Sequence, residues 1–214
     1  MIVISIIDSA PFGVGSPAIR VEPVQARSTA RVNALLDSAS DVMHDLGYEQ
    51  LTTAMVAERA GASIGTVYRY FPDRIAVLQA VAARNLERAS RAVLARLSAV
   101  NPRSVPETID CVLDALGDVF RSERGYRSLR VGDGLDIRPV TAGRGGNAEL
   151  ARVIRDDMHH RLGLRLDSAS RLSIETACDV IDSLLGRAFL SSERGDATLI
   201  AEARRMGRAA IADV

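Results

Sequence analysis

Apolar side chains recur at three- and four-residue intervals along most of the chain, and this spacing limits what the sequence can fold into. It is typical of amphipathic α-helices that bury one face. The first stripe comprises Val32, Leu35, Leu36, Ala39, Val42, Met43 and Leu46. Comparable stripes recur as far as Ala210, whereas alternation typical of a β-strand is confined to residues 2–7. We therefore expect an all-α fold.

Proline and glycine divide this helical chain into segments. Residues 1–26 are rich in both and lack a helical period, which predicts a flexible N-terminal arm. We expect residues 27–72 to form a three-helix domain and residues 73–214 a second helical domain. Asp73 is placed to cap a long helix that spans roughly 37 Å at 1.5 Å per residue. The glycines of residues 132–147 predict a long loop.

Composition excludes several classes of protein. All 27 basic residues are arginines, which excludes a Walker-A lysine, a Schiff-base lysine and a pyridoxal-phosphate enzyme. The net charge is zero, so no overall positive field attracts nucleic acid or an anionic membrane. Cys111 and Cys178 are isolated and indicate buried thiols. With no signal peptide and no run of 18 apolar residues, we expect a cytoplasmic protein without a membrane partner, a metal or another cofactor.

The most informative segment covers residues 51–74 and reads LTTAMVAERAGASIGTVYRYFPDR. Two short helices, capped by Thr52 and Ser63, are predicted on either side of Gly61. Together they match a helix-turn-helix, whose second helix can lie in the DNA major groove. Base edges can be distinguished there by hydrogen bonding. The segment therefore predicts a DNA-binding element.

Several side chains of this segment suit contacts with a duplex. Hydroxyl groups at a helix start suit a phosphate, as at Thr52 and Thr53. Arg69 can bind a guanine edge or a phosphate, and Gly65 permits close approach of the backbone. The candidate DNA-binding residues are Thr52, Thr53, Ser63, Gly65, Thr66, Tyr68, Arg69, Tyr70 and Arg74.

These residues make the sequence resemble the tetracycline-repressor (TetR) family of bacterial transcriptional regulators over about residues 27–78. The resemblance is carried by Leu51-Thr52-Thr53, Val56-Ala57, Ala60-Gly61-Ala62-Ser63, Gly65-Thr66, Tyr68 and Tyr70-Phe71. It implies that the candidate residues face DNA and that Arg69 reads a base. Ala54 and Met55 depart from the family, which often has charged residues there, and the N-terminal arm is longer than usual.

The resemblance also implies how such a protein works. Family members are all-helical homodimers whose second domain binds a small-molecule effector that releases the DNA. We expect the last two helices, over about residues 168–191 and 196–212, to pair with their mates in the dimer. A twofold dimer requires a near-palindromic operator of double-stranded DNA. The protein is thus expected to be a transcriptional regulator that acts as a repressor, and not an enzyme.

Charge leaves alternatives open. Between residues 26 and 75, five arginines face six acidic side chains, a net charge of −1, although DNA-binding domains usually present a basic surface. One alternative is therefore a helical sensor that binds a small molecule and has weak or no affinity for DNA. A helical enzyme is a second alternative, but we identify no convergent acid, base and nucleophile for it.

Two further motifs mimic chemical sites. Gly61-Ala62-Ser63-Ile64-Gly65 matches the G-x-S-x-G of hydrolases, but that motif needs a strand before the serine and a helix precedes it here. Asp156-Asp157-Met158-His159-His160 suggests metal ligands, yet a metal site needs three or four that converge, so a solvated helix flank is favoured. Asp157 and Arg161, four residues apart, form either a structural ion pair or the polar end of a cavity.

The effector site is less readable than the DNA-binding segment. Ligand sites in helical bundles lie between facing helices. Position and size nominate six effector-binding residues, each equally consistent with plain core: Leu116, Phe120, Tyr126, Met158, Cys178 and Phe189.

Overall fold

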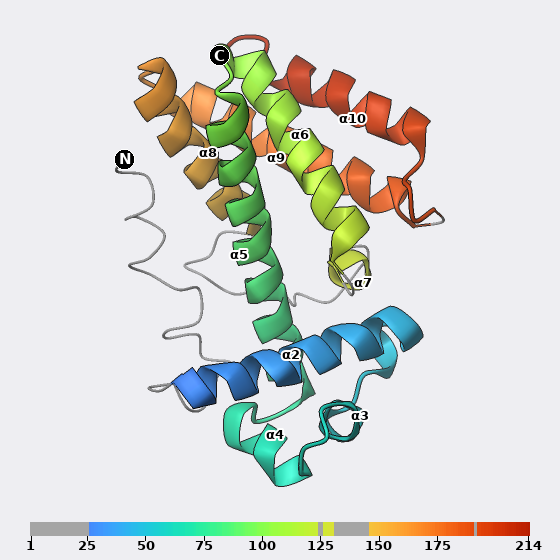
Figure 1. Ribbon diagram of the computed structural model, residues 1–214. Helices are drawn as coiled ribbons and strands as arrows, with labels where there is room; N and C mark the ends of the chain where they lie inside the picture. Colours follow the sequence, from blue (N-terminus) through green and yellow to red (C-terminus); the bar gives the residue numbers. More distant parts are fainter. Residues whose placement is uncertain (1–25, 124–125, 131–145, 191) are drawn as a thin grey trace. The chain divides into compact units, whose positions relative to one another are not determined.

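The computed structural model describes residues 26–123, 126–130, 146–190 and 192–214 (Figure 1). All regular secondary structure in these ranges is helical, which confirms the expected all-α fold. The predicted arm lies outside the described residues except for Ala26, as does the predicted 132–147 loop up to residue 145. No helix in the described ranges is long and apolar enough to cross a membrane.

The first compact unit contains the N-terminal helices and the first part of a longer one. Its elements are α2 (Ala26–Leu46), the 3-10 helix η1 (Tyr48–Gln50), α3 (Thr53–Arg59), α4 (Ile64–Tyr70) and the start of α5 (Arg74–Val100). Gly47, with a φ of 85°, follows the last residue of α2 and adopts the left-handed conformation common at the end of a helix. The apolar stripe of α2 supplies the core, except that Leu46 is exposed.

Helix α5 belongs to both units. It is continuous over 27 residues, which confirms the predicted long helix, and Asp73 caps it by accepting a hydrogen bond from the Ala76 amide at 2.8 Å. The first unit reaches Glu87, beyond the boundary expected at residue 72. Arg84 explains this extension, because its guanidinium donates to the carboxylate of Asp37 at 2.7 Å and to the Ser40 hydroxyl at 3.0 Å, both on α2.

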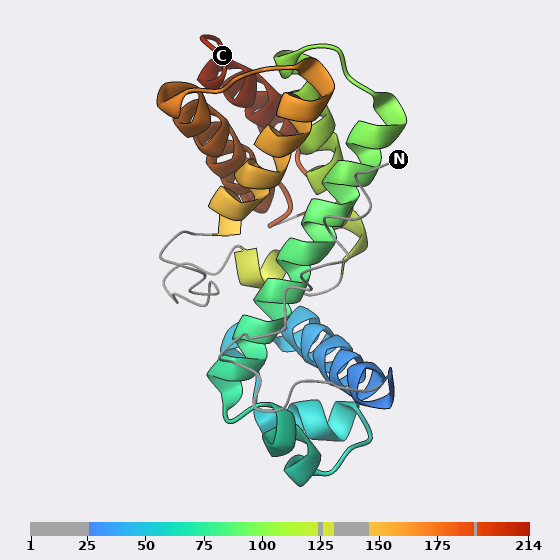
Figure 2. The ribbon, with the colours of Figure 1, turned by 90° about the vertical axis from the view of Figure 1, so that its left-hand side faces the viewer.

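The second unit begins at Arg88 and contains the remaining helices. They are α6 (Val105–Ser122), α7 (Tyr126–Arg130), α8 (Gly146–Leu162), α9 (Ser168–Ala188) and α10 (Ala197–Ala210). The bounds of α9 and α10 agree with the two final helices predicted from the sequence. These two helices lie side by side as an antiparallel pair (Figure 2).

The contact between α9 and α10 depends on a small residue. Gly207 is buried, and a Cβ atom there would lie 2.9 Å from Cδ1 of Ile181 on α9 and 3.4 Å from Cγ2 of Ile109 on α6. A larger side chain would therefore force these neighbours to move, since cores are packed nearly as densely as organic crystals.

Ion pairs join α10 to α6 beside this contact. Arg204 donates to Asp114 at 2.6 Å and pairs with Asp110 at 3.0 Å, and Arg208 also pairs with Asp110. Partial burial alone would raise the pKa of Asp110, but the two arginines outweigh it and hold that pKa below its ordinary value. Asp110 is therefore held as a carboxylate between two guanidinium groups.

Candidate nucleic-acid interface

Helices α3 and α4 form the predicted helix-turn-helix. The Thr52 hydroxyl accepts a hydrogen bond from the Met55 amide at 3.2 Å, and the Ser63 hydroxyl accepts one from the Thr66 amide at 3.2 Å. Both predicted N-caps are thus confirmed. Gly61 takes the positive φ of 58° that the turn requires, and Val67 of α4 is buried. The local sequence therefore fixes both helix starts and the turn between them.

One side of α4 is exposed and carries most of the candidate residues. Ser63, Gly65, Tyr68 and Arg69 are exposed, and Thr66 is half-buried. The hydroxyls of Ser63 and Thr66 lie 2.9 Å apart, so the two groups form one polar patch at the helix start. A Cβ atom on Gly65 would meet only the Ser63 hydroxyl, at 3.8 Å, so the backbone there is uncovered.

The start of α3 adjoins this side of α4. The Thr53 hydroxyl donates to the Tyr68 hydroxyl at 3.4 Å, and Thr52 is exposed next to it. The structure thus brings together seven predicted residues from two helices: Thr52, Thr53, Ser63, Gly65, Thr66, Tyr68 and Arg69. We call this set the α3–α4 face.

Tyr70 does not belong to the α3–α4 face, so its predicted outward position is wrong. It is only 5% exposed and belongs to the core with Val67 and Phe71. Val67 lies three residues earlier on α4, and this spacing places both side chains on the buried side of the helix. The neighbouring Arg69 is exposed, and its guanidinium lies 5.9 Å from the centroid of the Tyr70 ring.

Arg74 is also placed differently from the expectation that it faces DNA. Its guanidinium donates to the backbone carbonyl of Leu51 at 2.8 Å, of Tyr48 at 2.7 Å and of Glu49 at 3.1 Å. These carbonyls belong to η1 and to the residue that precedes Thr52. Arg74 therefore holds the chain segment that leads into α3, which is a positioning role.

Ile64 is an outward residue that the sequence analysis missed. It is the first residue of α4 and is 43% exposed, whereas most apolar residues of the first unit are buried. An apolar residue directly after a polar N-cap was the available signal. Its side chain adds an apolar element to a face otherwise made of hydroxyls, bare backbone and one guanidinium.

Charge on the first unit is partly neutralised within it. Arg59 pairs with Asp45 at 3.0 Å, and Arg84 pairs with Asp37. Arg69 forms no ion pair among the described residues, so its charge remains available on the α3–α4 face. The acidic side chains of α2 therefore do not cancel the one positive charge of the face.

The six residues nominated for effector binding are all buried in the second unit. Phe120 contacts Tyr126 edge to face, with ring centroids 4.9 Å apart, and stacks on Phe189 at 5.4 Å. Burial raises the pKa of the Cys178 thiol to about 12, which keeps it neutral. None of the six lines either of two surface pockets of this unit.

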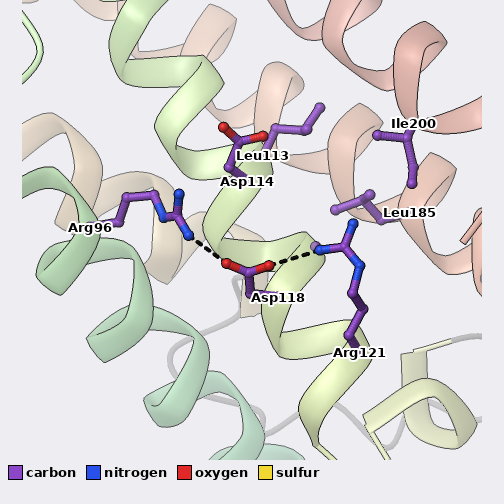
Figure 3. A pocket seen from close by; sticks show the side chains of 8 residues that line it. Arg96, Leu113, Asp114, Asp118, Arg121, Leu185 and Ile200 are labelled. Atoms are coloured by element: carbon purple, nitrogen blue, oxygen red, sulfur yellow. Dashed lines mark hydrogen bonds and ion pairs between the residues drawn. The ribbon is translucent and has the colours of Figure 1, made fainter. Parts of the chain in front are cut away.

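One of these pockets, of about 320 Å³, lies between charged residues and apolar residues (Figure 3). Asp118 lies between Arg96 and Arg121 and pairs with both, at 2.8 Å for Arg121. The other acidic residue that lines the pocket, Asp114, pairs with Arg204. Since these charges are matched within the protein, the pocket presents no unpaired charged group for a ligand.

The motifs that mimic chemical sites have structural explanations. Helix α3 precedes Ser63 and α4 follows it, so the strand of a nucleophile elbow is absent there. No group of three metal-ligating side chains lies together in the described ranges. Asp157 pairs with Arg161 at 2.7 Å, and Arg161 also donates to the Thr108 hydroxyl at 2.9 Å and to the Pro102 carbonyl. The pair therefore ties α8 to the start of α6.

Comparisons with known proteins agree with this geometry. Residues 35–81 match the family model for bacterial regulatory proteins of the tetR family, and residues 103–212 match that for the tetracyclin repressor-like C-terminal domain. The chain belongs to the TetR family of bacterial regulators. It is a DNA-binding transcriptional regulator, and the family consists of regulators and not of enzymes.

Individual relatives point the same way. An uncharacterized HTH-type transcriptional regulator of Mycobacterium tuberculosis is 29% identical over 74% of this chain and 87% of its own. The repressor KstR of Rhodococcus jostii is 40% identical over 58 residues, 27% of each chain. The crystal structure of a TetR-family regulator from Streptomyces coelicolor has a TM-score of 0.71 and 29% identity, and the match covers 86% of this chain and 99% of that one.

Proposed function

We propose that the protein is a repressor that binds a near-palindromic DNA operator through the α3–α4 face and is released by a small-molecule effector. The observation that carries the proposal is the α3–α4 face itself. Exposed hydroxyls, an uncovered backbone at Gly65 and the Arg69 guanidinium, which forms no ion pair with the residues that the structure describes, lie together on two short helices. The 40% identity to the KstR repressor supports repression as the mode of action.

The residues of this face divide into two proposed roles. Hydroxyls of Thr52, Thr53 and Tyr68 contact phosphates, which fixes the orientation of the protein without reading sequence. Arg69 and Ile64 lie on α4 and reach base edges, where a guanidinium pairs with guanine and an apolar side chain contacts a thymine methyl. Gly65 permits the close approach on which both kinds of contact depend.

Homodimerisation through α9 and α10 supplies the second copy of this face. Both helices and their immediate flank carry exposed apolar side chains, with Leu172 65%, Leu190 60% and Met206 37% exposed. Burial of such side chains against a second copy contributes about 25 cal/mol per Å² of apolar surface. A twofold assembly would then require two half-sites, which explains a near-palindromic operator.

Release by an effector requires a difference in affinity between two states of the dimer. The effector is proposed to favour a state of the dimer that fits DNA poorly. The aromatic cluster of Phe120, Tyr126 and Phe189 remains the proposed site of effector binding, because ligand sites in helical bundles lie between helices and are lined mostly by apolar and aromatic side chains.

The proposal can be tested with labelled duplexes that tile the DNA upstream of the protein's own coding sequence. Fluorescence anisotropy should reveal one fragment that binds at least tenfold more tightly than a scrambled duplex of equal length, at about 150 mM salt. Sedimentation velocity should show a dimer on its own and two protomers per duplex in the complex. Equal, weak binding to every fragment would instead favour the sensor that does not bind DNA.

A further inference from the structure

A second pocket in the C-terminal unit is lined by several positively charged side chains that form no ion pair among the described residues. It has a volume of about 610 Å³ and lies where α8 ends, the chain turns and α9 begins. Arg155 of α8, Arg165 of the turn and Arg171 of α9 line it, together with His159 and His160. None of these three arginines forms an ion pair within the described part of the chain.

Several other arginines of the same unit do have acidic partners. Arg96, Arg161 and Arg204 each pair with an aspartate within 3.0 Å. A guanidinium binds such partners well, because its planar fork of donors matches the two oxygens of a carboxylate or phosphate. Three guanidiniums that line one pocket without a partner therefore indicate a place for an anion from outside the chain.

The acidic groups nearest the pocket are already engaged. Asp156 also lines the pocket, but its carboxylate accepts a hydrogen bond from Arg152 at 2.8 Å. Asp167 caps α9 and accepts a hydrogen bond from the Ser170 amide at 2.8 Å. Neither carboxylate forms an ion pair with the three arginines among the described residues, although the charge of Arg171 contributes to lowering the pKa of Asp167.

The backbone around the pocket is fixed by its own hydrogen bonds. Gly163, with a φ of 71°, ends α8, and its amide donates to the His159 carbonyl at 3.1 Å. The His159 ring nitrogen Nδ1 lies 2.8 Å from the Leu164 carbonyl and donates to it. Half-buried Leu164 and Leu166 add an apolar wall beside the cationic side chains. The pocket thus has cationic and apolar walls, and hydrogen bonds fix the turn that carries part of its lining.

We propose that this pocket binds the oxyanion group, phosphate or carboxylate, of a small molecule that also carries an apolar portion. The guanidiniums of Arg155, Arg165 and Arg171 bind the oxygens by charge-assisted hydrogen bonds, and the two leucines contact the apolar portion. The volume lies within the range of small-molecule sites, about 300–1,000 Å³. This site is separate from the α3–α4 face and does not depend on DNA binding.

Isothermal titration calorimetry on the full-length protein tests the site with two probes, inorganic pyrophosphate and glutarate, at constant ionic strength and without DNA. Saturable binding of pyrophosphate alone identifies a phosphate site, and saturable binding of glutarate alone a carboxylate site. The double variant R155Q/R165Q should weaken binding by about tenfold or more, because hydrogen bonds to charged groups are lost. Arg194→Gln, an exposed arginine outside the pocket, should leave binding unchanged and serves as the matched control.

Circular dichroism and thermal unfolding of each variant show whether it is folded. If the double variant does not fold, Arg171→Gln alone replaces it, since that side chain is exposed on the first turn of α9. The proposal is overturned if neither probe gives saturable heat at millimolar concentration, or if a folded pocket variant binds the probes as tightly as Arg194→Gln does.

Discussion

The guanidinium of Arg74 donates from its Nε to the backbone carbonyl of Leu51 at 2.8 Å, across 23 residues of sequence. Leu51 directly precedes Thr52, the N-cap of α3. The first turn of α5 is thereby joined to the residue from which the helix-turn-helix starts. Because α5 continues without a break to Val100, Arg74 connects the DNA-binding helices to a helix shared by both units.

Replacement of Arg74 by Met should therefore destabilise the protein more than it changes the DNA-facing surface. Methionine keeps much of the aliphatic stem but leaves three carbonyls without their donor, at a cost of about 1–3 kcal/mol. Urea unfolding followed by circular dichroism measures this change. An unaltered free energy of unfolding combined with a large loss of DNA affinity would instead assign Arg74 to a phosphate contact.

Tyr68→Phe and Tyr70→Phe make a matched pair of variants. Tyr68 is 46% exposed and Tyr70 only 5%, so only the first loses a hydroxyl that can reach a phosphate. We expect Tyr68→Phe to weaken operator binding about threefold to tenfold, the worth of one hydrogen bond, without loss of stability. Fluorescence anisotropy on both variants checks this, and an equal effect from Tyr70→Phe would contradict the placement of the α3–α4 face.

Arg69→Ala separates base reading from phosphate binding. If Arg69 pairs with a guanine, the change should cost about 1–3 kcal/mol on the native operator and relax specificity at one position. Anisotropy with operators substituted at each base pair measures this. A uniform loss of affinity over all sequences would mark a phosphate contact instead. The slope of log affinity against log salt concentration would then also be smaller by about one.

Gly65→Ala tests whether the uncovered backbone of α4 matters for DNA. A Cβ atom there meets only the Ser63 hydroxyl at 3.8 Å, so the change should leave the fold intact. Alanine in place of a helical glycine should stabilise the protein by about 0.5–1 kcal/mol. We expect thermal unfolding to show this gain and anisotropy to show weaker operator binding, and undiminished binding would remove Gly65 from the contact set.

Cys178 should make stability fall at alkaline pH. Burial raises the pKa of its thiol to about 12 from an ordinary value of 9.0, so the unfolded chain ionises first as the pH rises. Its stabilising contribution is complete below pH 9 and declines by roughly 1.4 kcal/mol per pH unit between 9 and 12. Urea unfolding at pH 8, 9.5 and 10.5 should show this slope, and Cys178→Ala should lack it. The same slope in both proteins would attribute the decline to other groups, such as tyrosines.

The sequence predicts those features of the α3–α4 face that depend on near neighbours. Thr52, Gly61 and Ser63 act through residues within a turn, so their roles as caps and turn residue follow from local pattern. The spacing of Tyr70 from Val67 was also a local signal, which the prediction of an outward Tyr70 did not use. Arg74 is different, because its partners come from residues distant in sequence. The carbonyls that Arg74 reaches lie 23 to 26 residues earlier, and no local spacing indicates them.

Pocket lining was less predictable still. Apolar stripes correctly placed Leu116, Phe120 and Phe189 in the interior, but a stripe cannot distinguish a filled core from a hollow one. The pocket around Arg155 and Arg171 is made mostly of polar residues from two helices and the turn between them. The position of this pocket depends on how the two helices pack against each other, and the spacing of apolar residues in the sequence does not specify that packing.

The contact of Gly207 with Ile181 has a mechanical consequence. The two helices approach so closely at Gly207 that no space is left for a side chain there, and such densely packed contacts resist relative movement. Helices α9 and α10 should therefore move together as one rigid unit, with α6 packed against them through Ile109. A second copy of the protein that docks on α9 and α10 would meet a preformed surface. Formation of the dimer should therefore require little internal rearrangement of either copy.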